Sequence, residues 1–200
     1  MREAPTFCLT AVDFYGFGQT PAPTYPVDLQ YYVDGVVALM RHYNMEDVTV
    51  VAHSFGARVA IRLATQCDRV NGLVLVGAAG LKPRRGIRYY CRLARARWYA
   101  LWGMPRPKGS PDYEALSGAM RRTFVNIIHT YQDAEVARIT CPVLLVWGTL
   151  DTETPMYMLR RFQRLLPQSR TVLLEGCGHF CFAEQPARFD ALVKEYANNL

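Results

Sequence analysis

The sequence lacks any apolar run long enough to cross a membrane. Its longest apolar run, around Leu73 to Leu81, is interrupted by Gly77 and Gly80, and it is far shorter than the ~20 residues that a membrane-spanning helix needs. Residues 1 to 7 also lack the apolar segment that is typical of a secretory signal peptide. We therefore expect a cytoplasmic protein.

Internal repeats and low-complexity tracts are missing as well. The chain has 200 residues, of which 50% are hydrophobic, so it can bury the core of one domain. A framework of disulfides is not expected either, because the six cysteines are scattered and several lie in apolar surroundings. We expect buried free thiols at these positions. The cysteines are residues 8, 67, 91, 141, 177 and 181.

A complete set of metal ligands is not apparent. Cys177, His179 and Cys181 lie close together in the sequence, but a closed zinc site takes four ligands and no matching second pair lies nearby. We expect neither a metal nor another cofactor.

Negative charge is missing from one long segment. Between Lys82 and Lys108 there are nine basic residues and no acidic one, which more than accounts for the net charge of +6. Apolar residues recur in this segment at helical spacing, from Ile87 through Trp98 to Leu101, and most arginines fall outside that stripe. We expect a solvated helix face with arginines lying over apolar neighbours. The alternative is that the charge attracts an anionic substrate or an acidic membrane surface. Nucleic acid is not expected as a partner, because no nucleic-acid-binding motif accompanies the charge.

The alternation of strand-like and helix-like segments predicts an α/β fold with a mostly parallel sheet and crossover helices. Between residues 82 and 138 no strand pattern occurs, so we expect a core of residues 1–81 and 139–200 with a helical cap inserted over 82–138. A helix is expected to begin near Pro155. The other predicted elements are strands over Thr6 to Val12, Val48 to Ala52, Val70 to Val76, Cys141 to Trp147 and Thr171 to Leu174, and a helix over Val27 to Tyr43.

The most informative segment is Val50 to Ala57, in which an apolar strand meets Ser54 and a small-residue helix follows at once. A serine at such a turn sits on a strained backbone above a helix N-terminus, where its hydroxyl is exposed for nucleophilic attack. The pattern is G-x-S-x-G with Ala52 in place of the first glycine, and Gly56 would permit a close approach on the far side.

A nucleophilic serine needs a histidine that takes its proton and a carboxylate that orients the histidine. Asp151 follows the strand that ends near Trp147, and His179 follows the strand that ends at Leu174. Glu153 and Glu175 are alternative carboxylates, but the position of Asp151 favours it. We expect His53, beside the serine, to pack or to line the pocket.

The order serine, aspartate, histidine, each on a loop after a strand, resembles the alpha/beta hydrolase superfamily. Asp13 to Pro21 is similar to the D-x-x-G-x-G loop of that superfamily, where Asp13 would brace its own loop, and parts of residues 82–85 and 112–123 are similar to the cap of a bacterial subgroup. The resemblance implies that Ser54 is the nucleophile, His179 the general base and acid, Asp151 its orienting partner, and the Phe55 backbone N–H an oxyanion donor.

The chain departs from the superfamily at its N-terminal side. Relatives usually have three strands before the loop at Asp13 and a His-Gly motif that supplies a second oxyanion donor, and the sequence contains no His-Gly pair. We expect either an N-terminally truncated chain or a first strand that has moved to pair beside Val48 to Ala52. Losing one oxyanion donor typically lowers turnover by about a hundred- to a thousand-fold.

Two functional hypotheses follow. The first is a serine hydrolase that cleaves a small carboxylic ester or related acyl substrate through an acyl-enzyme, with amides, lactones and carbon–carbon bonds beside a ketone left open. The second is a catalytically impaired hydrolase-like protein that binds a ligand or partner, with dimerisation through an exposed sheet edge.

Overall fold

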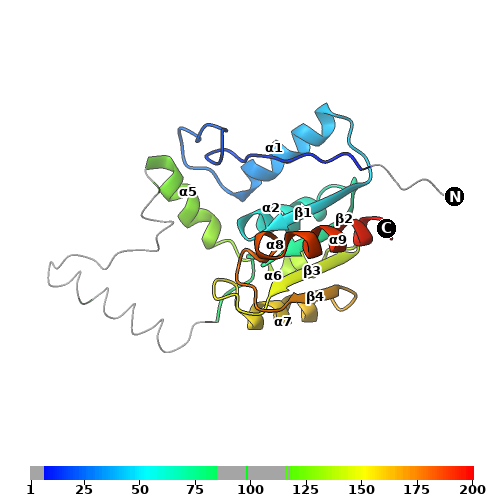
Figure 1. Ribbon diagram of the computed structural model, residues 1–200. Helices are drawn as coiled ribbons and strands as arrows, with labels where there is room; N and C mark the ends of the chain where they lie inside the picture. Colours follow the sequence, from blue (N-terminus) through cyan, green and yellow to red (C-terminus); the bar gives the residue numbers. More distant parts are fainter. Residues whose placement is uncertain (1–6, 85–97, 99–115, 117) are drawn as a thin grey trace.

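The structure, a computed structural model, describes residues 7–84, 98, 116 and 118–200. These residues form a four-stranded sheet in the order β1-β2-β3-β4, with helices packed on it (Figure 1). Every pair of neighbouring strands is parallel, as the sequence predicts. The strands are β1 (Val48–His53), β2 (Val70–Val76), β3 (Val143–Gly148) and β4 (Arg170–Leu174). The helices are α1 (Leu29–His42), α2 (Phe55–Ala64), α5 (Gly118–Ile128), α6 (Asp133–Val136), α7 (Met156–Leu165), α8 (Cys181–Glu184) and α9 (Pro186–Ala197).

Side chains of the central strands enter two separate hydrophobic cores, because successive residues of a strand point to opposite faces. Leu73 and Leu75 of β2 belong to the larger core, which also contains residues of α1, α2 and α7. Val74 and Val76 of the same strand belong to the smaller core, with Tyr196 of α9. Both faces of the sheet are therefore covered, which explains the apolar runs from Leu73 to Val76 in β2 and from Val143 to Trp147 in β3.

Helix α1 begins where the sequence places a capping residue. The Asp28 carboxylate accepts a hydrogen bond from the backbone N–H of Tyr31 at 3.1 Å, which satisfies one of the free donors of the first turn. Leu29, Tyr32 and Val33 return at helical spacing and are buried. Burial of this stripe seats α1 on the core beside α2.

The strand predicted over Thr6 to Val12 is not found. Residues 7–12 have no regular secondary structure, and Leu9 is 93% exposed. In the described residues β1 pairs with β2 alone, so the first segment has not moved to the other edge of β1. A β-branched pattern favours an extended chain, but a strand forms only where a neighbour completes its backbone hydrogen bonds.

Residues 118–136 are fastened to α2 by buried polar contacts. The guanidinium of Arg58, which is 9% exposed, donates to the carbonyl oxygens of Ile127 and Thr130 at 3.1 and 2.7 Å. Arg62 forms an ion pair with Glu135 at 2.7 Å. These contacts hold α5 and α6 against α2.

Several sequence predictions lie wholly or partly outside the described residues. Most of the predicted cap and its apolar stripe belong to residues 85–97 and 99–115, and Trp98 alone of that stripe is described. The assignment of 82–138 as a cap therefore stays a prediction. None of the described helices is both long and apolar enough to span a membrane.

The five described cysteines carry free thiols. Cys177 and Cys181 are buried, in agreement with the sequence interpretation, and Cys67 and Cys141 are partly buried. Cys8 is exposed and corrects that interpretation, because its segment packs against no neighbouring strand.

Candidate active site

Three loops carry the predicted site residues to one edge of the sheet. Ser54 directly follows β1, Asp151 lies three residues after the end of β3, and His179 lies five residues after the end of β4. Because the strands are parallel, their carboxyl ends meet at the same edge. Ligands of open α/β sheets bind at this edge.

Ser54 occupies the sharp turn between β1 and α2 that the sequence predicts. Its backbone has φ 47° and ψ −108°, a conformation that is costly for a residue other than glycine. Its N–H donates to the Val76 carbonyl at 3.1 Å, and its own carbonyl accepts from the N–H groups of Ala57 and Ala79 at 3.2 and 3.3 Å. The strained turn is thus tied to both β2 and α2.

Gly56 does not provide the close approach that the motif suggests. A Cβ atom at Gly56 would lie 3.9 Å from the Ala52 Cβ and 4.0 Å from a ring carbon of Phe14. Both are ordinary van der Waals distances, so space alone does not require glycine at this position.

Asp151 and His179 are joined directly. The Oδ2 atom of Asp151 lies 2.9 Å from Nδ1 of His179, and both side chains are almost fully buried. Because a carboxylate accepts, the hydrogen bond places the proton on Nδ1 and leaves Nε2 available. Asp151 is therefore the carboxylate that orients this ring, whereas Glu175 is exposed and has no hydrogen bond to it.

Hydrogen bonds from residues 153 and 154 hold the Asp151 carboxylate in place. The N–H groups of Glu153 and Thr154 both donate to Oδ1 of Asp151 at 2.9 Å, and the Thr154 hydroxyl donates to Oδ2 at 2.7 Å. Burial alone would raise the pKa of Asp151, but the hydrogen bonds from His179 and Thr154 outweigh it and lower the pKa. The sequence analysis missed Thr154, although an aspartate three residues before a threonine in a loop is typical of such a turn.

His53 holds the backbone of His179, a role beyond the packing that the sequence suggests. Its Nε2 lies 2.9 Å from the carbonyl oxygen of His179, and the two rings are 4.5 Å apart. A carbonyl can only accept, so His53 carries its proton on Nε2. Burial lowers the pKa of His53, which favours this neutral, donating ring.

The free nitrogen of His179 faces a second carboxylate. Its Nε2 lies 3.5 Å from Oε2 of Glu153, whose side chain is 59% exposed. In the described part of the chain, no hydrogen bond joins the Ser54 hydroxyl to His179. The structure thus brings Asp151 and His179 into contact, and it places Ser54 at the same sheet edge without that contact.

Two glycines allow these loops to approach one another. Gly77 has φ 47°, and a Cβ there would lie 3.1 Å from Asp151 Oδ2 and 3.2 Å from His179 Nδ1. A Cβ at Gly148 would lie 2.1 Å from the Gly178 carbonyl oxygen, which no side chain can tolerate. Both glycines follow or end buried strands, which is the signal in the sequence that could have identified them.

The N-terminus of α2 presents the predicted oxyanion donor. Phe55 is the first residue of α2, so its N–H has no acceptor within the helix. Its ring stacks on Phe17 with centroids 5.4 Å apart, and the Asp13 carboxylate braces the Phe17 loop by accepting from the Gln19 N–H at 3.1 Å. The positive end of the helix dipole lies beside Ser54.

The two cysteines near His179 lie among apolar side chains. Cys177 and Cys181 are buried in the smaller core, and burial raises the pKa of Cys181 to about 11. No cluster of three metal-ligating side chains occurs among the described residues.

Comparison with known proteins extends the resemblance over nearly the whole chain. An uncharacterized protein of Mycobacterium tuberculosis (strain ATCC 25618 / H37Rv) is 27% identical over 237 residues, which cover 98% of this chain and 69% of that protein. The 2-hydroxymuconate semialdehyde hydrolase of Pseudomonas sp. (strain CF600) is 25% identical over 218 residues, which cover 93% and 75% of the two chains. An esterase from Exiguobacterium antarcticum has a similar fold, with a TM-score of 0.72 and 17% identity over 92% of this chain and 79% of that one. The family model of the alpha/beta hydrolases matches residues 2–192, and the chain therefore belongs to the alpha/beta hydrolase family.

Proposed function

We propose that the protein is a serine hydrolase that cleaves a small carboxylic ester through an acyl-enzyme. The observation that carries this proposal is the buried hydrogen bond between Asp151 and His179, 2.9 Å long, at the sheet edge where Ser54 sits on a strained turn. This combination is the constellation of a nucleophile, a base and an orienting acid. Family membership and the named hydrolase relative support it.

The reaction begins when the Ser54 oxygen attacks the ester carbonyl carbon while Nε2 of His179 takes the hydroxyl proton. The Phe55 N–H then donates to the oxyanion that forms. When this intermediate collapses, the carbon–oxygen bond to the alcohol breaks and His179 returns the proton to the leaving alcohol. Water attacks the acyl-enzyme by the same route and releases the acid. No hydrogen bond joins Ser54 to His179 among the described residues, so this step requires the Ser54 hydroxyl and Nε2 of His179 to come within hydrogen-bond distance.

The energetics of His179 suit a general base. Burial by itself would lower the pKa of His179, but the hydrogen bond and charge of Asp151, together with the charge of Glu153, raise it. The ring can therefore hold the proton that it takes from Ser54 until the leaving group needs it.

We also propose that residues 82–138 form a cap that shapes the acyl pocket.

A fluorophosphonate probe tests the proposal, because it reacts with activated serines. We expect labelling of the wild-type protein, no labelling of Ser54→Ala, and unchanged labelling of Ser169→Ala. Ser169 is a matched control, since its hydroxyl donates to the Leu166 carbonyl near β4 and does not take part in the site. Hydrolysis of p-nitrophenyl acetate should follow the same pattern. Folded wild-type protein that resists the probe would contradict the proposal.

The second candidate is a non-catalytic protein that binds a ligand or a partner. One observation favours it: β1 forms an edge of the sheet in the described residues, and Val51 on that strand is 45% exposed. An exposed strand edge offers unpaired backbone groups to another chain. A folded, unlabelled protein that associates with itself would support this candidate over the first.

A further inference from the structure

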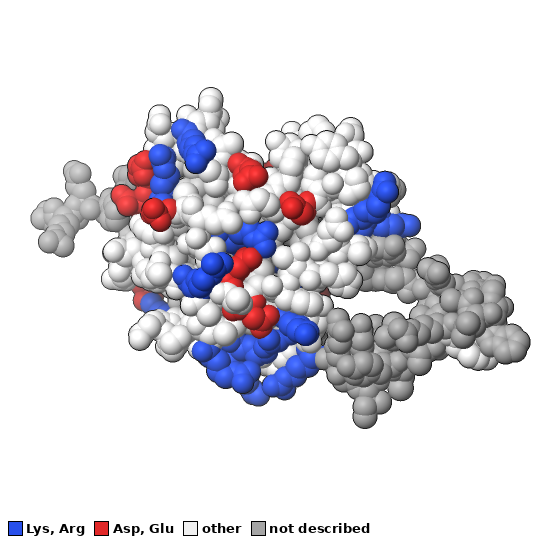
Figure 2. Space-filling view, turned by 180° about the vertical axis from the view of Figure 1, so that it is seen from behind, with Lys and Arg blue, Asp and Glu red and all other residues white. Residues whose placement is uncertain are grey.

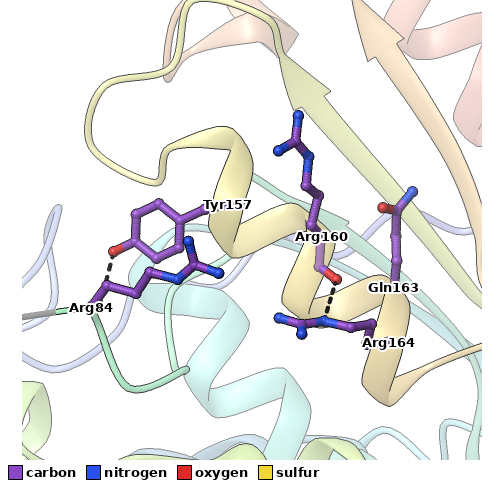
Figure 3. A pocket seen from close by; sticks show the side chains of 5 residues that line it. All are labelled: Arg84, Tyr157, Arg160, Gln163 and Arg164. Carbon is purple, nitrogen blue, oxygen red and sulfur yellow. Dashed lines mark hydrogen bonds between the residues drawn. The ribbon is translucent and has the colours of Figure 1, made fainter.

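A polar surface cavity of about 490 Å³, open to solvent, lies beside α7, and none of its lining residues belongs to the candidate active site. It is lined by Arg84, Tyr157, Arg160, Gln163 and Arg164 (Figure 3). Arg84 follows the loop after β2, and the other four residues lie on α7. Every lining side chain can donate a hydrogen bond, and none is a carboxylate.

The arginines of this cavity have no carboxylate partner within the residues that the structure describes. In the described part of the chain, Arg84, Arg160 and Arg164 form no ion pair with a carboxylate. By contrast, Arg161 on the same helix pairs with Asp133, and it also donates to the Lys82 carbonyl. The cavity therefore gathers positive charge that no carboxylate among the described residues neutralises, whereas the charge of the neighbouring Arg161 is neutralised.

Two of these guanidinium groups are already held in place. That of Arg84 lies 5.2 Å from the centroid of the Tyr157 ring, and the Arg84 backbone N–H donates to the Tyr157 hydroxyl oxygen at 3.3 Å. The Nε of Arg164 donates to the Arg160 carbonyl at 3.3 Å. The terminal nitrogens of both groups, and the Tyr157 hydroxyl proton, are left to bind a ligand. In Figure 3 the Arg84 and Arg164 side chains extend toward each other from opposite sides.

Two of the arginines stand close together on one helix. Arg160 and Arg164 are four residues apart on α7, and like charges at that spacing repel each other. Figure 2 shows Lys and Arg side chains gathered at the lower edge of the molecule, the edge along which α7 lies in Figure 1. An anion in the cavity would relieve this repulsion.

We propose that this cavity binds a phosphate-bearing anion with at least two negative charges. The planar fork of arginine matches phosphate oxygens in pairs, and several arginines around one space favour a multiply charged ligand. The volume lies within the range of small-molecule sites, roughly 300–1,000 Å³. Neither a neutral ester nor its reaction at Ser54 explains such a site, so the proposal goes beyond the hydrolase function.

Calorimetric titration with inorganic pyrophosphate at low ionic strength tests the proposal. We expect binding by the wild-type protein and a loss of roughly tenfold or more in affinity for Arg164→Gln and for Arg84→Gln, since each removes charged hydrogen bonds. Arg164→Lys, which keeps the charge and loses the fork, should weaken binding less than Arg164→Gln. Thermal unfolding of each variant confirms that it is folded.

Arg170→Gln is the matched control. Arg170 is exposed and lies on β4, where it pairs with Glu195 at 2.7 Å, so the variant removes the same formal charge outside the cavity. We expect it to bind pyrophosphate like the wild-type protein. An equal loss in this variant would show attraction by net charge alone and would overturn the proposal.

Binding to lipid vesicles distinguishes the two possible sources of the phosphate group, a lipid headgroup and a free phosphorylated molecule. Sedimentation with vesicles of phosphatidylcholine containing phosphatidic acid, compared with phosphatidylcholine alone, tests a lipid headgroup. Arginine-dependent binding to the acidic vesicles without pyrophosphate binding would assign the site to a headgroup, and binding of pyrophosphate alone would assign it to a free phosphorylated molecule. If neither probe binds, the proposal is wrong.

Discussion

At the scale of single residues, the surroundings of His179 change its pKa in opposite directions. Asp151 faces Nδ1, Glu153 faces Nε2 and the His53 ring packs against one side. Burial lowers the pKa of His179, but the two carboxylates more than reverse this effect and raise it. Glu153 thus lies near Nε2, the nitrogen that takes the Ser54 proton in the proposed mechanism.

Glu153→Gln should lower the pKa of His179, because it removes a negative charge 3.5 Å from the ring. The acid limb of the pH profile for kcat/KM should then move to lower pH. Protonated His179 stabilises the fold below its unfolded pKa, and this contribution is lost as the pH rises through the raised folded pKa. The variant should therefore lose a little stability at low pH and none at high pH.

NMR titration of the histidine ring signals measures this pKa without depending on activity. Glu175→Gln provides the comparison, because Glu175 is an exposed acid on the His179 loop and is not among the causes of the His179 shift. An unchanged pKa in Glu153→Gln, or an equal change in both variants, would contradict the assignment.

At the scale of elements, the contact of α5 and α6 with α2 depends on a few buried polar groups. Arg58 donates to two backbone carbonyls from a position that is 9% exposed. The Gln132 side chain, which is fully buried, donates to the Arg58 carbonyl at 2.9 Å and to Glu135 at 2.7 Å. Each of these donors satisfies an oxygen of another residue, so its removal leaves a buried oxygen unpaired, as the Oε1 atom of Gln132 already is.

Arg58→Met should lower the free energy of unfolding by about 1–3 kcal/mol, since it keeps the aliphatic stem but leaves buried carbonyl oxygens without a donor. Arg69→Met is the control, because Arg69 is about one-third exposed and its ion pair with Glu46 is at the surface. We expect that change to cost less than about 1 kcal/mol. Urea unfolding followed by circular dichroism measures both, and equal losses would show that burial of Arg58 does not matter.

The sequence predicts best those elements that a local pattern of apolar residues identifies without knowledge of their neighbours in space. Strand β2 matches the expected Val70 to Val76, because its apolar run from Leu73 to Val76, ended by Gly77, is typical of a strand buried on both faces. The loops with Asp151 and His179 follow from their places after strand ends. The segment from Thr6 to Val12 has a similar pattern, but its pairing depends on a partner strand that local sequence does not specify.

The contacts of His53 and Gly77 that the sequence analysis missed are contacts between distant segments of the chain. His53 reaches a carbonyl 126 positions away, and Gly77 faces a carboxylate and a ring that belong to two other loops. Their roles arise from tertiary proximity, which spacing along the chain does not encode. Thr154 is the exception, because its contact with Asp151 is local and its signal is present in the sequence.

At the scale of the whole molecule, the described sheet has an unshielded side. Strand β1 pairs with β2 on one side, and in the described residues no strand pairs with the other. Natural sheets protect such edges with charges, bulges or covering segments. The apolar side chain of Val51, 45% exposed, does not provide that protection.

If this edge mediates association, Val51→Lys should abolish it, because a charge on an edge strand opposes pairing with a second strand. Light scattering over a range of protein concentrations should show a rising mass for the wild-type protein and a constant one for the variant. Leu150→Lys, at an apolar loop position that is 64% exposed, should behave like the wild-type protein. A wild-type mass that stays that of a single chain at every concentration would exclude the edge as an interface.

The close approach of Gly148 to the His179 loop limits how the site can move. The N–H groups of Thr149 and Leu150 donate to the carbonyls of Leu174 and Cys177 at 3.2 and 2.8 Å. These bonds join the acid loop and the base loop into one unit, which should open and close cooperatively and exchange its amide protons together. The turn at Ser54 is bonded to β2 and α2, and the adjacent His53 bonds the His179 carbonyl at 2.9 Å, so this contact couples the serine turn to the unit that carries the base.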